Sequence, residues 1–340
     1  MNNIDVLIPM YNAEKTIKEC IKSLLNQTMN VNIIVCDDCS TDNSFNIVSN
    51  FKLDNLTIIR NDENIGYLKT FNKLLECSQA EYISFVDADD FIEKDKIKKQ
   101  FDYLNKNKNI DIVGCNFRRI DNNNKFESAS SDLPLEHDDI IKAILLGEEA
   151  VCGSSLMIRK AVKVSIGGYR DYFIGKVGED IDWVARISQK HNINNINYCG
   201  YNYRMTFGSL TRNVSYDVEK IHIHDFIIFL FESRLKNNSL IDIVDCNNEL
   251  EIAAFFEKFK LAYDSYPYKL YAKTAFGHAL NKNYKSSLID LAKCFHKKTS
   301  LLVIVKTILS LFMIFLLPHG LLLKLKEKLK IKNIAKRLTK

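Results

Sequence analysis

The first residues in this sequence that could do chemistry are the aspartates of a VDADD run. Asp87, Asp89 and Asp90 follow the apolar run YISFV, so three carboxylates lie within four residues. Such carboxylates repel one another unless a cation or a protonated neighbour relieves the repulsion. Divalent cations such as Mn²⁺ and Mg²⁺ bind one or two carboxylates and complete their shell with phosphate oxygens and water. The run therefore predicts a Mn²⁺ or Mg²⁺ site beside a phosphate-bearing ligand. The alternative is a cap for a helix beginning near Glu93.

A second acidic pair, Asp37 and Asp38, follows the apolar run VNIIVC and continues as DDCSTDNS. Ser, Thr, Asp and Asn are preferred at helix N-termini, which accounts for Thr41 and Asp42. Capping does not account for two acids placed directly at a strand end. This pair is therefore a second candidate for ligand binding.

The elements that must position these acids alternate between short apolar runs and stretches with apolar residues at helical spacing. The alternation predicts right-handed crossovers and a mostly parallel α/β sheet with helices on both faces. Ligands bind beyond the carboxyl ends of such strands, which selects the loops 9–12, 37–40, 61–66 and 87–90. The expected strands are 5–9, 31–36, 56–60, 82–86 and 111–115, and the expected helices are 14–27, 43–51, 68–77 and 94–106.

The remaining sequence changes character twice. A polar loop is expected over 121–140, then a strand over 154–159, a helix over 180–189 and an aromatic strand over 196–204. From about Tyr216 the pattern is helical. We expect a catalytic α/β domain over 1–215, a helical accessory region over 216–298 and a membrane-associating segment over 299–340.

The net charge divides unevenly along the chain. Residues 321–340 carry eight Lys or Arg and one Glu, a net charge of +7, so the formal +5 of the whole chain leaves −2 on the other 320 residues. A basic body that binds nucleic acid is excluded. The apolar run 300–317 and the basic stretch after it favour contact with an anionic membrane surface. The alternative is a buried helix followed by a solvated charged tail.

Cysteine content and the N-terminus indicate the compartment. The nine cysteines are an odd number, and Cys36 and Cys39 form a CxxC without a second pair at zinc-site spacing. The first nine residues contain Asp5 and resemble a strand rather than a secretory signal. We expect reduced thiols and a cytoplasmic protein, peripheral on the inner face of the cell membrane.

Five segments in order resemble the family 2 glycosyltransferases, the large inverting group with the GT-A fold. The resemblance covers roughly residues 3–212 and implies transfer of a sugar from a nucleotide-diphosphate sugar, such as a UDP-sugar, to an acceptor hydroxyl with a divalent metal. The segments are VLIPMYNAEKTIKECIKSLLNQT, IIVCDDCSTDNS, NIGYLKTFNKLL, AEYISFVDADD and GEDIDWVARI.

The resemblance assigns roles to individual residues of this chain. Asp180 would be the general base and Asp89 the metal ligand. A carboxylate at the N-terminus of the expected helix is stabilised as an anion, and partial burial would raise its pKa toward usefulness. The plain alternative for Asp180 is a helix cap. The residues assigned to the nucleotide sugar are Pro9, Tyr11, Glu14, Asp38, Asn64, Lys69, Asp87 and Arg212.

The chain departs from the family pattern at three positions. Cys39 stands where Gly is common after the paired acids, and Phe71 stands where many members have Arg, so a basic contact must come from Lys69 or be missing. Thr206 stands where some members have a His. Arg suits phosphate geometry, so the candidates for closing over a diphosphate are Arg204, Ser209 and Arg212.

Aromatic and histidine residues carry weaker hypotheses. Trp183, Tyr198, Tyr201 and Tyr203 could stack on a sugar, with core packing as the alternative. The HxH formed by His222 and His224 points its two side chains apart on a helix, which argues against a metal site.

The leading hypothesis is an inverting glycosyltransferase that acts on a lipid-linked or glycan acceptor in cell-surface polysaccharide synthesis. The Q-x-x-R-W signature of processive synthases is absent, which favours addition of a single sugar. An inactive nucleotide-sugar-binding scaffold is the alternative. A nucleotidyltransferase would need a Gly-rich phosphate loop, and residues 9–14 contain no Gly.

Overall fold

The computed structural model describes residues 3–126, 130–205, 214–281 and 283–294, together with 305 and 308. The chain divides into two compact units. The first comprises residues 1–206 with 227–242, and the second comprises 207–226 with 243–340. The domain limits expected at 215 and 298 stay a prediction. In this division the segment 227–242 returns to the first unit.

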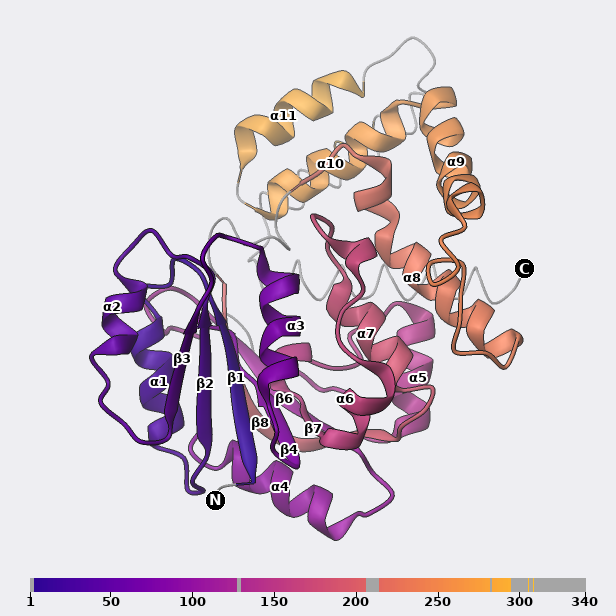
Figure 1. Ribbon diagram of the computed structural model, residues 1–340. Helices are drawn as coiled ribbons and strands as arrows, with labels where there is room; N and C mark the ends of the chain where they lie inside the picture. Colours follow the sequence, from indigo (N-terminus) through magenta and orange to yellow (C-terminus); the bar gives the residue numbers. More distant parts are fainter. Residues whose placement is uncertain are drawn as a thin grey trace. The chain divides into compact units, whose positions relative to one another are not determined.

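The first unit is built on an eight-stranded sheet (Figure 1). Four apolar runs form its parallel half, since β1 pairs with β2 on one side and β4 on the other, and β2 pairs with β3. Every residue of β1 is buried, as expected for a central strand covered on both faces. The strand order is β3 (Leu56–Arg60), β2 (Asn32–Asp37), β1 (Ile4–Met10), β4 (Tyr82–Phe85), β7 (Met157–Arg159), β6 (Ile112–Ile120), β8 (Ile193–Arg204) and β5 (Phe91–Ile92).

The direction of strand addition reverses between β1 and β4. The chain moves outward from β1 to β2 to β3, and then returns past β1 to form β4. Figure 1 shows α1 (Ile17–Leu25) and α2 (Ser44–Ser49) on one side of these strands and α3 (Tyr67–Cys77) on the other. Such a reversal leaves a crevice outside the carboxyl ends of the strands, where ligands bind in open α/β sheets.

The other half of the sheet is mixed. The short strand β7 runs antiparallel to both β4 and β6, while β6 and β8 are parallel with a register shift between Cys115 and Phe117. β5 pairs antiparallel with the end of β8. This pairing brings residues near 201–204 against the loop that follows β4.

The remaining helices of the first unit are α4 (Lys96–Lys106), α5 (His137–Leu146), α6 (Lys160–Ile166) and α7 (Glu179–Ile187), with short 3₁₀ turns η1 (Gly153–Ser155) and η2 (Asp171–Phe173). The loop expected through residue 140 ends earlier, because α5 begins at His137. Two acids lie in its first turn and Gly147 ends it in the left-handed conformation. The strand expected over 154–159 is divided between η1 and β7.

An aromatic cluster lies between α3, β4 and α7. Phe71 stacks on Tyr169 with ring centroids 3.9 Å apart, and Trp183 meets both rings and Phe85 edge-on at 5.7–5.8 Å. Trp183 is 2% exposed and Tyr201 is fully buried. The sugar-stacking hypothesis is therefore wrong for these two residues, because their rings are enclosed in the core.

The second unit is helical. It contains the first part of α8 (Val218–Lys236), then α9 (Glu249–Ser265), α10 (Tyr268–Leu280) and α11 (Tyr284–Lys293). His222 pairs with Asp225 at 2.7 Å and Tyr263 at 2.8 Å and stacks on Phe259, so this histidine packs within the second unit, whereas His224 is exposed. Within the described ranges, no helix has the length and apolar character needed to cross a bilayer. The expected membrane segment 299–340 lies outside the described residues, apart from positions 305 and 308.

Candidate active site

The loop after β1 is tied to the loop after β2. The side chain of Asn12 accepts a hydrogen bond from the Thr41 backbone at 2.9 Å, and Glu14 accepts one from the Asn43 backbone at 3.1 Å. Pro9 is buried within β1, whereas the side chain of Tyr11 is 49% exposed. The two loops therefore present Tyr11 at the carboxyl edge of the sheet.

Asp38 is 2% exposed and orders the loop after β3. Its carboxylate accepts hydrogen bonds from the Asn61 side chain at 2.8 Å and from the backbone N–H groups of Ile65 at 2.9 Å and Gly66 at 2.8 Å. An ionised carboxylate has about four acceptor positions. The three bonds occupy three of these positions and hold the Asp38 carboxylate in place.

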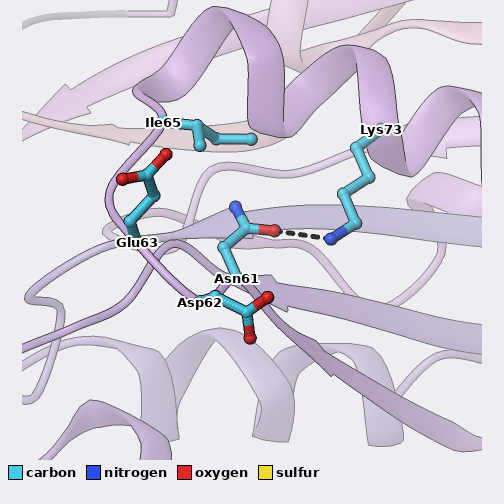
Figure 2. A pocket seen from close by; sticks show the side chains of 5 residues that line it. All are labelled: Asn61, Asp62, Glu63, Ile65 and Lys73. Atoms are coloured by element: carbon cyan, nitrogen blue, oxygen red, sulfur yellow. Dashed lines mark hydrogen bonds between the residues drawn. The ribbon is translucent and has the colours of Figure 1, made fainter.

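A cavity of about 400 Å³ lies beside this loop, lined by Asn61, Asp62, Glu63, Ile65 and Lys73 (Figure 2). Lys73, from α3, donates to the Asn61 side-chain oxygen at 2.7 Å. That bond fixes the Asn61 amide so that its NH₂ group faces Asp38.

The exposed side chains of Asn64 and Lys69 are not among the residues that line this cavity. Lys73 is the basic residue that the structure brings to it, at a position the motif comparison did not single out.

The backbone conformation at Cys39 shows why glycine is common at this position in the family. Its φ is +59°, in the left-handed region that glycine enters without the steric cost of a Cβ. Cysteine therefore holds a strained turn conformation of the kind that favours glycine, and Asp38 keeps its place beside it.

The three acids after β4 have different surroundings. Asp87 accepts hydrogen bonds from Tyr67, at 3.1 Å, and from Ser154. Asp90 is buried and accepts from Tyr201 and from the Arg204 backbone, each at 2.7 Å. Asp87 and Asp89 are both half-buried. Asp90 is thus enclosed in the fold, whereas Asp87 and Asp89 lie at the partly open edge.

Arg204 supports this loop from behind. It is 4% exposed, and its guanidinium donates to the Asp89 carbonyl at 2.7 Å, to the Asn124 side chain at 2.6 Å and to Glu19 at 2.7 Å. The hypothesis that Arg204 closes over a diphosphate is wrong, because its donors are engaged within the fold. Ser209 and Arg212, the other two candidates, lie outside the described residues.

The donor set suits a hard divalent cation held with phosphate oxygens. Across the parts of the chain that the structure describes, no three His, Cys, Asp or Glu side chains are arranged as a metal site. The half-buried Asp89 has the carboxylate oxygens that Mn²⁺ or Mg²⁺ prefers and would be the residue to hold such an ion, since these ions commonly take one or two carboxylates and complete the shell with phosphate and water.

Asp180 lies at the beginning of α7, directly after Gly178 and Glu179. A Cβ added to Gly153 would lie 3.3 Å from its carboxylate oxygen, so the η1 turn approaches Asp180 closely. Burial raises the pKa of Asp180. Burial also raises the pKa of Asp87, and the charge of Asp180 adds to that rise. Asp180 and Asp87 are each half-buried, and the charge effect between them places the predicted base and the first acid after β4 in one acidic site.

Two residues that the sequence analysis did not assign complete this site. Tyr67 and Ser154 hold the two carboxylate oxygens of Asp87, and Ser154 follows the glycine that contacts Asp180. The run of small residues at 153–155 is the sequence signal that could have indicated a close approach here.

Helix α7 is fixed by several bonds to the loop before it. Trp183 donates to the Gly167 carbonyl at 2.9 Å, Arg186 donates to the Gly168 carbonyl at 2.6 Å, and Asp182 pairs with Arg170. These contacts set the direction in which α7 begins and so position Asp180.

The same loop is bound to α3 by Asn72, whose side chain accepts from the Tyr169 backbone N–H at 2.8 Å and donates to its carbonyl at 2.9 Å. A Cβ at Gly168 would lie 2.1 Å from the Asn72 oxygen, so any other residue there would displace the Asn72 amide from its two bonds to Tyr169.

Glu179 gives the site a measurable pH dependence. Burial raises its pKa from 4.5 to about 7, with further contributions from the negative charges of Asp180 and Asp87. Between these values the folded protein binds more protons than the unfolded chain, so its stability falls as pH rises from about 4.5 to about 7.

We expect Glu179→Gln to remove this loss of stability. At pH 8 its free energy of unfolding should exceed that of the parent by on the order of 1–2 kcal/mol, because one pKa unit corresponds to about 1.4 kcal/mol. At pH 4.5 the two proteins should differ little. Urea unfolding of both proteins at the two pH values measures the difference. The exposed Glu148→Gln is the matched control. Equal pH dependence of parent and Glu179→Gln would contradict the assignment.

The fold and the site together define a class of protein. The mixed α/β sheet, with its strand-order reversal and with acids at the carboxyl ends of its strands, corresponds to the GT-A fold of glycosyltransferases. Residues 5–164 match the model of glycosyl transferase family 2. This stretch is therefore a family 2 glycosyltransferase domain, as the first four of the five motifs indicated, and the chain is a glycosyltransferase.

Relatives and solved structures agree with this class. The UDP-Glc:α-D-GlcNAc-diphosphoundecaprenol β-1,3-glucosyltransferase WfgD of Escherichia coli is 28% identical over 214 residues, which cover 62% of this chain and 80% of WfgD. The poly(ribitol-phosphate) β-glucosyltransferase of Bacillus spizizenii is 32% identical over 165 residues, which cover 45% of this chain and 25% of that protein.

The fold resembles that of S. aureus TarS residues 1–349 in complex with UDP-GlcNAc, with a TM-score of 0.56 and 18% identity, covering 84% of this chain and 88% of that one. The mannosyltransferase PcManGT from Pyrobaculum calidifontis, solved with GDP-Man and Mn²⁺, gives a TM-score of 0.51 at 15% identity, covering 99% and 83%.

Proposed function

We propose that this glycosyltransferase moves a sugar from a UDP-sugar to a hydroxyl of a lipid-linked or glycan acceptor, with inversion at the anomeric carbon, in cell-surface polysaccharide synthesis. The observation that carries the proposal is that the η1 turn brings Asp87 and the half-buried Glu179–Asp180 pair together: Ser154 bonds to Asp87, and Gly153 lies against Asp180. On this proposal, a nucleotide-binding group and a proton-accepting group belong to one site.

On the donor side, the remaining acceptor position of Asp38 suits the imide N–H of uracil. Asp38, Tyr11 and Asp87 lie after three neighbouring strands, β2, β1 and β4, so they can contact the base and ribose of one nucleotide. Glu14 orders the same edge through its bond to Asn43. Pro9, Asn64, Lys69 and Arg212 remain predictions from the motif comparison.

On the acceptor side, Asp180 accepts the proton of the attacking hydroxyl. A buried carboxyl whose pKa is raised is a stronger base than an exposed one, which suits proton removal as the new glycosidic bond forms. Asp89 would hold Mn²⁺ or Mg²⁺. When bound, the cation supplies charge neutralisation for the departing diphosphate.

We also propose that the protein acts at the inner face of the cell membrane. Its support is the basic and apolar composition of 299–340, the charge of which suits anionic lipids. Relatives that use diphosphoundecaprenol-linked sugars act on substrates that are themselves lipids.

The test is release of nucleoside diphosphate by the purified full chain from UDP-glucose, UDP-N-acetylglucosamine and GDP-mannose, with Mn²⁺ or with EDTA. An undecaprenyl-diphosphate-linked sugar is the acceptor. We expect turnover with a UDP-sugar and Mn²⁺, stimulated by the acceptor. Donor binding by calorimetry without any turnover would instead favour the inactive scaffold, and absence of both binding and turnover would overturn the proposal.

A further inference from the structure

The hydroxyl of Tyr201 bonds to both ends of the aspartate run 87–90. It donates a hydrogen bond to the Asp90 carboxylate at 2.7 Å and accepts one from the Asp87 backbone N–H at 3.2 Å. Tyr201 is fully buried and Asp90 is 2% exposed, so the bridge lies inside the fold. The half-buried Asp89 lies between the two bridged residues. One buried hydroxyl therefore holds the two sides of the predicted metal ligand together.

Strand β8 supplies the other fixed points of the run. The Arg204 backbone N–H donates to the second carboxylate oxygen of Asp90 at 2.7 Å, and the Arg204 guanidinium donates to the Asp89 carbonyl at 2.7 Å. β5 begins directly after Asp90 and pairs with β8, which places Ile92 opposite Tyr201. Both oxygens of Asp90 are thus bonded to β8, and the conformation of the run depends on that strand.

The Tyr201 ring is itself held in one position by close packing. The preceding Gly200 lies against α4, since a Cβ added to it would lie 2.9 Å from Cγ of Lys96. The buried ammonium of Lys96 lies 6.0 Å from the centre of the Tyr201 ring and donates to Ser84 at 3.1 Å. A side chain locked by its surroundings is suited to ordering a binding loop.

We propose that Tyr201 is a positioning residue for the divalent cation, because its hydroxyl holds the run 87–90 in the conformation in which Asp89 binds Mn²⁺ or Mg²⁺. The proposal rests on the metal role proposed for Asp89 and adds the group that prepares that residue. Groups that orient a metal ligand from behind typically contribute about 10–100-fold to metal affinity. Since Tyr201 is fully buried, it acts through Asp87 and Asp90.

The test is Tyr201→Phe, which removes the hydroxyl and keeps the ring. Calorimetric titration of the full chain with UDP-glucose, in Mn²⁺ and in EDTA, measures how much affinity the cation adds. We expect the affinity in Mn²⁺ to fall about 10-fold or more and the affinity in EDTA to stay within about twofold of the parent. An unchanged Mn²⁺ effect would overturn the proposal. An equal loss with and without Mn²⁺ would also overturn it, because that result indicates a general defect in the fold.

The matched control is Tyr82→Phe at the beginning of β4. Tyr82 is 5% exposed, and its hydroxyl likewise donates one bond, to Asn105 at 2.9 Å, and accepts one, from Arg159 at 3.0 Å. The aspartate run follows the opposite end of this strand. Tyr82→Phe therefore removes a comparable buried hydroxyl and should keep the full Mn²⁺ effect. An equal loss of that effect in both variants would contradict a specific role for Tyr201.

Two further measurements separate the positioning role from the proposed function. Adding Tyr201→Phe to Asp89→Asn should weaken binding no further than Asp89→Asn alone, since the tyrosine acts through Asp89, and a further loss would overturn the proposal. In the metal-free protein, hydrogen–deuterium exchange of the peptide 86–92 should be several-fold faster in Tyr201→Phe, because the Asp87 N–H loses its acceptor. A parent that binds no UDP-sugar would overturn the proposed function, whereas unchanged exchange in Tyr201→Phe would overturn the positioning role alone.

Discussion

Replacing Asp180 by asparagine is expected to lower the rate of sugar transfer by about 10²–10⁴-fold, the range that a positioned general base contributes. Asparagine keeps the size of the side chain and its acceptor oxygen for the Ile181 backbone N–H, but it cannot accept the proton of the acceptor hydroxyl. The donor-side residues Asp38 and Asp87 are unchanged. The loss should therefore appear in kcat, with the dissociation constant for UDP-sugar within a few-fold of the parent.

Single-turnover transfer and calorimetry with the same donor separate these two effects. Asp171→Asn, which changes an exposed acid of the preceding 3₁₀ turn, is the control for nonspecific charge effects and should retain parent activity. In the parent, the rate should fall as pH falls through the raised pKa of Asp180, because only the ionised carboxylate accepts a proton. Near-normal turnover by Asp180→Asn would show that another group is the base.

The edge of the sheet was predictable because it depends on local patterns. The run LTIIR forms β3 with the expected limits, and the acids that follow VNIIVC and YISFV do lie at strand ends. Alternation of strands and helices allows few topologies. The carboxyl ends of β1, β2 and β4 therefore lie at the same edge of the sheet. The candidate residues that follow these strands lie there too, although they are far apart in the sequence.

The side-chain partners within the site were not predictable, because they come from pairings far apart in the sequence. Arg204 contacts Asp89 across 115 positions, and it does so through β8, whose pairing with β5 has no local signal. The sequence does not show whether a basic residue near the predicted diphosphate site faces the ligand or the core. The burial of its side chain distinguishes the two cases, and Arg204 is buried.

The phenylalanine at position 71 led to a wrong choice of the basic residue on α3 that lies at the cavity. The absence of an arginine there led to Lys69 as the replacement, yet Phe71 packs on Tyr169 in the aromatic cluster and Lys73 reaches the cavity beside Asp38. Residues 69 and 73 are both one turn or less from Phe71 on α3. Helical spacing alone could not choose between them, whereas the contact with Asn61 does.

Replacing Asp89 by asparagine is expected to weaken Mn²⁺-dependent binding of a UDP-sugar by at least about 100-fold. Outer-shell partners of a bound metal already contribute about 10–100-fold to its affinity, so loss of a direct carboxylate should cost at least as much. Asparagine retains an oxygen but loses the negative charge that balances the cation. Calorimetric titration of UDP-glucose with Mn²⁺ and with EDTA measures the effect without requiring turnover.

The comparison with EDTA makes this prediction specific to the cation. The metal-independent affinity should be equal in Asp89→Asn and the parent, because the nucleotide contacts proposed for Asp38 and the β1 loop lie at a different part of the edge. Asp54→Asn, a change at an exposed acid before β3, is the matched control and should keep the full Mn²⁺ effect. If Asp89→Asn also keeps the full Mn²⁺ effect on UDP-sugar affinity, another residue is the metal ligand, and Asp87 becomes the candidate. Its carboxylate would then have to exchange the hydroxyls of Tyr67 and Ser154 for the cation, which predicts a Mn²⁺ affinity that rises when Ser154 is replaced by alanine.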